Sequence, residues 1–80
     1  MGRYYKLSRS IKEENAGKIT EELLSLDQVK NAVFDEDFGG ITIFADPDVY
    51  TQVMDRAVNI FAREGEGAEL SFQRFVFPES

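Results

Sequence analysis

Residues 15–34, NAGKITEELLSLDQVKNAVF, place a helical pattern and a strand pattern on either side of one short turn. Apolar side chains first recur every three or four residues, which is typical of a helix with one buried face. The run Val29–Phe34 then carries β-branched and aromatic residues, which favour strands. This stretch therefore predicts one helix that leads directly into one strand. The apolar stripe of that helix is Ala16, Ile19, Leu23 and Leu26.

The residues before this stretch predict where the helix begins. Ser10 stands three residues before Glu13, which is the spacing of a reciprocal capping box. We therefore expect the helix to run from about Lys12 to Leu26. Residues 4–8 alternate in polarity, as in a half-buried first strand.

The residues after this stretch predict a hairpin. Val29–Phe34 and Ile41–Ala45 flank the turn Asp35–Gly40, so the two runs should pair as antiparallel strands. Gly39 and Gly40 are expected to supply the positive φ that such a turn needs.

A second helix follows the hairpin. Asp46-Pro47-Asp48 supplies an N-cap, a proline at the first helical position and an acid in the first turn. Arg63 falls in the last turn, and Gly65 is expected as a left-handed C-cap. The buried face of this helix should consist of Val49, Val53, Ala57, Ile60 and Phe61.

The last strand, Ala68–Phe77, completes the order β-α-β-β-α-β. Its apolar residues change phase between Phe72 and Phe75, which indicates a bulge or a sheet edge. Two helices of this size can cover only one face of a four-stranded antiparallel sheet, so the sequence predicts an α+β, ferredoxin-like fold. Right-handed crossovers would place the first and third strands in the centre. Residues 1–80 should form a single domain.

The composition excludes several kinds of site. The chain has no Cys and no His, so the thiolate and imidazole ligands of zinc and copper sites are missing. Oxygen ligands remain, and these favour hard cations such as calcium or magnesium. We expect no signal peptide, and no apolar run in this sequence is long enough to span a membrane. We expect a cytoplasmic location, either alone or as the soluble domain of a membrane protein.

The charge is strongly asymmetric. The net charge is −6, with +1 in residues 1–30 and −7 in residues 31–80. An acidic surface repels phosphate backbones, so nucleic acid is not an expected partner. A small basic arm at the N-terminus could dock an acidic partner, although solvated surface charge is the preferred interpretation. The arm consists of Arg3, Lys6, Arg9 and Lys12.

The first helix resembles that of the heavy-metal-associated domain, in which C-x-x-C-A-x-K-I-x-x-x-L leads through a short turn into a strand. Ala16, Lys18, Ile19 and Leu23 match this pattern. The order of elements agrees over nearly the whole chain, and the polar second helix resembles the versions at the N-terminus of zinc- and cadmium-type P-type ATPases. The resemblance implies a ferredoxin-like module of a metal-transport protein that carries, senses or hands over a soft metal ion.

The resemblance ends at the metal ligands. Lys12 and Asn15 stand at the two cysteine positions, so no soft-metal site and no cofactor are expected. Glu13 and Glu14 are weak candidates for holding a cation, but acids in a first helical turn are better explained by the helix dipole. Residues 35–37 could gather calcium, yet they lack the ligand series of an EF-hand, so a solvated turn is preferred.

We expect no enzymatic activity. The sequence contains no Ser-His-Asp or Cys-His set and no glycine-rich phosphate loop. Acylphosphatases share the expected architecture and need an arginine with an asparagine. Arg9 with Asn15 or Asn31 could supply these, but the glycine-rich cradle beside Arg9 is absent. The strand Gly40–Ala45 likewise lacks the aromatic and basic signature of an RNA-recognition module.

An exposed aromatic surface is the expected binding feature. Tyr4, Phe44 and Phe75 should project from the sheet face that the helices leave open, where aromatic side chains often mark a partner surface. We therefore expect an interaction or regulatory module that binds a protein partner or a neighbouring domain of a metal transporter. The alternative is a stand-alone, small-ligand-sensing module of the same topology that dimerises through its sheet.

Overall fold

The computed structural model describes residues 2–77. It confirms the predicted element order and adds a short 3₁₀ turn before the second helix. The strands are β1 (Gly2–Leu7), β2 (Val29–Phe34), β3 (Gly40–Ala45) and β4 (Leu70–Val76); the helices are α1 (Glu13–Leu24) and α2 (Tyr50–Glu64), with the 3₁₀ turn η1 (Pro47–Val49).

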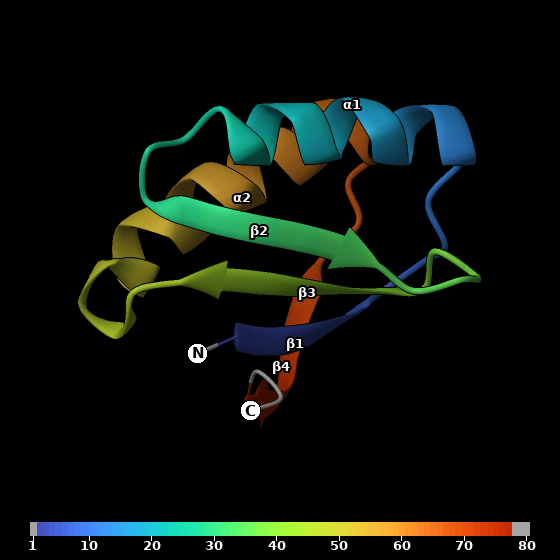
Figure 1. The fold of residues 1–80 in the computed structure, drawn as a ribbon. Helices are drawn as coiled ribbons and strands as arrows, with labels where there is room; N and C mark the ends of the chain where they lie inside the picture. Colours follow the sequence, from blue (N-terminus) through green and yellow to red (C-terminus); the bar gives the residue numbers. More distant parts are fainter. Residues whose placement is uncertain (1, 78–80) are drawn as a thin grey trace.

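The four strands form one antiparallel sheet in the order β2-β3-β1-β4, so the first and third strands are central as predicted. Both helices lie on one side of this sheet (Figure 1). The fold is therefore the predicted α+β, ferredoxin-like arrangement. No helix within residues 2–77 combines the length and apolar character needed to cross a membrane.

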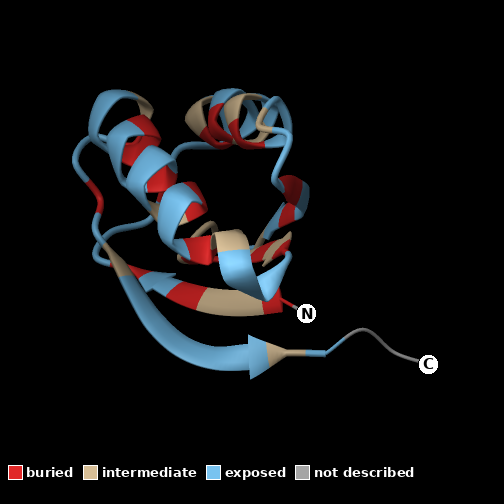
Figure 2. Ribbon diagram, turned by 90° about the vertical axis from the view of Figure 1, so that its left-hand side faces the viewer, coloured by how far each residue is buried: buried red, intermediate tan, exposed pale blue. Residues whose placement is uncertain are grey.

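The core fills the space between the helices and three of the strands. Alternate residues of β1 and β3 face the helices, which is the period of two expected for strands with one covered face. In β4, by contrast, no residue is buried, and Figure 2 shows this strand bending away from the helical layer. The fully buried large side chains are Ile19, Leu23, Ile41, Ile43, Tyr50, Val53 and Phe61.

Tyr50 attaches the start of α2 to the sheet. Its hydroxyl donates to the Ile43 carbonyl at 2.7 Å and accepts from the Ala45 N–H at 3.2 Å. Both backbone groups belong to β3, near the point where its pairing with β1 ends at Gly2. A buried polar group needs such partners, so this side chain satisfies its own hydroxyl and two backbone groups at once. Val49, which the sequence predicts on the buried face, is only half-buried.

The predicted N-terminal caps of both helices differ from the observed ones. Helix α1 begins at Glu13 with Lys12 in extended conformation before it, and no side chain caps its N-terminus, so the Ser10 capping box is wrong. The α1 helix also ends at Leu24, two residues before the predicted end. Pro47 opens the 3₁₀ turn rather than α2, and the Asp46 carboxylate pairs with Lys30 at 2.9 Å rather than capping a helix.

The positive φ angles fall on other residues than predicted. Phe38 has φ 57° in the hairpin turn, and Gly39 and Gly40 are not in the left-handed region. Gly40 is instead required for space, because a Cβ there would lie 2.6 Å from the Asp35 carboxylate and would collide with the Tyr4 hydroxyl. After α2, Gly65 has φ −107°, and the left-handed residues are Glu66 and Gly67.

The phase change in β4 is a bulge on an edge strand. Tyr5 pairs with Phe72, but Tyr4 pairs with Arg74, so Gln73 is the extra residue. A bulge moves every later side chain to the opposite face of the sheet. Phe75 consequently pairs with Arg3 on the side of the sheet that carries the helices. Its predicted place beside Tyr4 and Phe44 on the open face is therefore wrong.

We expect Tyr50→Phe to lower the free energy of unfolding by about 1–3 kcal/mol, because it removes two buried hydrogen bonds to backbone groups of β3. Urea denaturation followed by circular dichroism measures this loss. Tyr4→Phe is the matched control: its hydroxyl donates to the Asp35 carboxylate, which is only part-buried and can bind water instead. Equal losses in the two variants would contradict the anchoring role of Tyr50.

Alkaline pH should destabilise the fold. Burial raises the pKa of Tyr50 and of Tyr5, and the hydrogen bond to Asp35 raises that of Tyr4. The unfolded chain loses tyrosine protons near pH 10, while the folded chain retains them, so stability is complete below about pH 10 and falls as pH rises through the folded-state pKa values. Urea denaturation between about pH 8 and pH 11 should show this fall, and Tyr50→Phe should reduce it; a constant free energy of unfolding would overturn the prediction.

Candidate functional site

The loop between β1 and α1 is where the resemblance to the heavy-metal-associated domain places a metal. The chain leaves β1 at Leu7, buries Ile11 in the core and enters α1 after the extended residue Lys12. Lys12 is exposed, and Asn15 is half-buried one turn later. The two positions thus lie at the loop end of α1, as the resemblance requires.

Glu66 lies beside this loop and forms ion pairs with two of its residues. One of its carboxylate oxygens lies 3.6 Å from Lys12 Nζ, and the other lies 3.7 Å from Arg9 Nη1. Glu66 comes from the loop between α2 and β4, where φ 55° places it in the left-handed region. The loop is therefore joined to the other end of the chain by two exposed ion pairs, each worth about 0–1 kcal/mol.

The residues of this loop do not fit a soft metal ion. Thiolate and imidazole ligands are absent from the sequence, and an ammonium group stands at one of the two ligand positions. Glu13 and Glu14 are both exposed in the first turn of α1, in keeping with a dipole role. No cluster of three acids able to hold a metal occurs among residues 2–77.

Two of the three acids of the hairpin turn already have hydrogen-bond partners. The Asp35 carboxylate accepts the Tyr4 hydroxyl, and Asp37 Oδ1 accepts the Gly39 N–H at 2.9 Å. The second contact is the side-chain turn that aspartate commonly forms with the backbone two residues ahead. These contacts support the interpretation of residues 35–37 as a structural turn.

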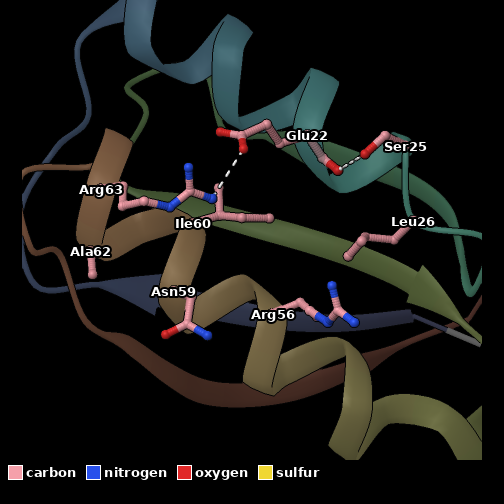
Figure 3. Close-up of a pocket in the computed structure, with 8 residues that line it drawn as sticks. All are labelled: Glu22, Ser25, Leu26, Arg56, Asn59, Ile60, Ala62 and Arg63. Atoms are coloured by element: carbon pink, nitrogen blue, oxygen red, sulfur yellow. Dashed lines mark hydrogen bonds and ion pairs between the residues drawn. The ribbon is translucent and has the colours of Figure 1, made fainter.

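A polar groove of about 610 Å³ lies between the two helices (Figure 3). Arg63 Nη2 donates to Glu22 Oε1 at 3.1 Å across it, and Ser25 Oγ donates to the Glu22 carbonyl at 2.6 Å. Arg56 lies apart from that pair. No side chain here is positioned as a nucleophile beside a base, so the groove offers no catalytic arrangement. It is lined by Glu22, Ser25, Leu26, Arg56, Asn59, Ile60, Ala62 and Arg63.

The open face of the sheet holds two of the three predicted interaction residues. Tyr4 and Phe44 are both half-buried there, and the Phe44 ring lies against Gly2, where a Cβ would be only 2.7 Å from the ring. Arg74 lies over the Tyr4 ring at 4.4 Å. Val33 extends this face and is 50% exposed. Phe75 lies on the other side of the sheet, 5.1 Å from the Phe72 ring.

Sequence reasoning missed two contributors to these sites. Glu66 is 54 residues from Lys12 in the chain, and no local pattern connects them. Gly2 sits at the start of the chain, and only the pairing of Gly2 with Phe44 reveals why a side chain there would displace the ring. The basic arm also separates: Arg9 and Lys12 pair with Glu66, while Arg3 and Lys6 point to opposite sides of the sheet.

Neither a protein-family model nor a curated protein matches this chain. Among solved structures, the chain is similar to the solution structure of the N-terminal domain of ZntA in its Zn(II) form. The TM-score is 0.67 at 17% sequence identity, and the match covers 95% of this chain and 96% of that chain. At this identity the likeness establishes the fold, over nearly the full length of both chains.

We expect no saturable binding of Zn²⁺, Cd²⁺ or Cu⁺ at residues 9–16, because the donors required are missing. Calorimetry with amide chemical shifts as the site-specific readout measures this. A stoichiometric site tighter than about 1 μM would contradict the expectation.

A double variant places cysteine at the two ligand positions of the family pattern. Lys12→Cys combined with Asn15→Cys places two thiols three residues apart at a helix start, where the dipole favours thiolates. This double variant should bind soft metals. If it folds and binds none, the loop does not have the geometry of a heavy-metal-associated domain.

Proposed function

We propose that this chain is a heavy-metal-associated-like domain that has lost its metal site and serves as an interaction or regulatory module of a metal-transport protein. The fold and its full-length similarity to the N-terminal domain of ZntA support the first part. The resemblance of α1 to the family pattern, outside its cysteines, supports the same relationship. A cytoplasmic site of action and a P-type ATPase as the parent protein belong to this proposal.

The observation that carries the proposal is the pair of contacts from Glu66 to Lys12 and Arg9. Where a metal-carrying domain would need a cation site with accessible ligands, this chain has two cations that share one carboxylate. A metal ion there would face the Lys12 ammonium at short range, and like charges at that distance repel. The loop is therefore assigned a structural role, which leaves binding to another surface.

We assign that binding to the open sheet face around Phe44. The ring is large, apolar and half-buried, and it lies directly over Gly2. The neighbouring Tyr4 ring is held by its hydrogen bond to Asp35. Aromatic anchors that are already immobilised lose little conformational entropy on binding, which favours them as centres of protein interfaces.

Phe44→Ala should weaken binding to the remaining domains of the metal transporter by about 1–3 kcal/mol, with little effect on folding stability. The partner for the test is the transporter encoded in the same reading frame or beside it, and calorimetry measures the affinity. Leu24→Ala is the control, because it removes an exposed apolar side chain, 46% accessible, from α1 instead.

Two results would argue against this assignment. If Phe44→Ala lowers the free energy of unfolding by more than about 3 kcal/mol and leaves binding intact, Phe44 belongs to the core. If sedimentation shows a dimer that Phe44→Ala dissociates, and no transporter domain binds, the chain is the stand-alone dimerising module instead.

A further inference from the structure

A cation without an acidic partner lies on the helix side of β4. The Arg3 guanidinium carbon is 4.1 Å from the centre of the Tyr50 ring, 5.5 Å from that of Phe75 and 6.0 Å from that of Phe72. Arg3 is half-buried, and its Nε is shielded from solvent without an acceptor. The ion pairs of residues 2–77 engage Arg9, Lys12, Lys30 and Arg63, and none engages Arg3.

The surroundings of Arg3 are apolar and accessible. Phe72 and Phe75 are each 47% exposed, and Leu70 lies on the same side of β4. A groove of about 400 Å³ between α2 and the start of β4 extends this surface to Val58, which is 54% exposed. We call the surface formed by Arg3, Val58, Leu70, Phe72 and Phe75 the β4 face.

We propose that the β4 face docks a segment of a partner protein that places a carboxylate between apolar side chains. The carboxylate would receive charge-assisted hydrogen bonds from the Arg3 guanidinium, a planar donor group suited to that geometry. The apolar neighbours of the carboxylate would cover Phe72 and Phe75. This surface is separate from the Phe44 surface of the proposed function, since the two lie on opposite sides of the sheet.

The length and the charge of the β4 face favour a peptide segment over other ligands. Strand β4 has seven residues, which at about 3.3 Å each spans roughly 20 Å, longer than a small organic acid. A free inorganic anion would leave the exposed aromatic rings uncovered. Nucleic acid would meet the acidic remainder of a chain with net charge −6. An apolar peptide segment with one acidic residue matches the length of the strand and supplies the acidic partner that Arg3 lacks within residues 2–77.

The test uses a blocked peptide that carries one glutamate between a leucine and a phenylalanine, titrated into the intact chain. Nitrogen–proton spectra should show saturable shifts at the Arg3 Nε–H and the amides of residues 70–76, with a Kd below about 1 mM. The same peptide with glutamine should bind at least tenfold more weakly. Equal binding of the two peptides, shifts centred on Phe44, or no saturable shift would overturn the proposal.

Matched variants locate the interaction. Arg3→Met should weaken binding of the glutamate peptide at least tenfold, whereas Arg74→Met, which removes the same charge from the other side of the sheet, should change it less than twofold. Phe75→Ser should also weaken binding of the glutamate peptide. This variant tests the proposal if Arg3→Met fails to fold. Unchanged binding by folded Arg3→Met or by Phe75→Ser would refute the proposal. A concentration-dependent dimer that Phe75→Ser dissociates would refute it too, because a second copy would then cover the face.

Discussion

The two hydrogen bonds of the Tyr50 hydroxyl to β3 determine how the helical layer sits on the sheet. They fix the first turn of α2 above the end of β3, and the rest of the helix then extends along its buried residues Val53, Ala57 and Phe61. Because the hydroxyl is buried and has backbone partners, α2 cannot slide along the sheet without leaving polar groups unpaired. The position of this helix is therefore specified by polar contacts as well as by apolar packing.

This placement explains why β4 differs from the other strands. Two helices cover β2, β3 and β1, and the sheet edge formed by β4 carries no buried residue. The ring of Tyr50 also supports Arg3, so the same side chain that anchors α2 holds a guanidinium beside the uncovered strand. The bulge at Gln73 then brings Phe75 to this side and increases the apolar area around that cation. Tyr50 and the extra residue Gln73 thus create the β4 face, which the fold topology alone does not require.

The β1–α1 loop is held by contacts with distant parts of the chain. A carboxylate from the α2–β4 loop lies near two of its side-chain cations. Each ion pair is exposed and contributes little to stability. The main stabilisation of the loop comes from buried Ile11 and from the backbone bond of its N–H to the Phe38 carbonyl at 3.0 Å. Apolar burial and this backbone hydrogen bond therefore hold the loop more strongly than its ion pairs do.

The sequence by itself determined the element order and the class of fold. These follow from local information: the spacing of Ala16, Ile19 and Leu23, and the β-branched runs around the Asp35–Gly40 turn. The same local rules wrongly predicted a side-chain cap from Ser10 and positive φ angles at Gly39 and Gly40, because turn chemistry depends on what packs against the turn.

Only the tertiary structure decided which residues share a surface. A one-residue bulge reverses the facing of every later side chain in β4, and the sequence indicated a bulge without fixing its position, so the grouping of Phe75 with Tyr4 was wrong. The partners Glu66 for Lys12 and Tyr50 for Arg3 lie far apart in the chain, and no local pattern encodes them. Local periodicity specifies elements, whereas pairing register and long-range contacts specify sites.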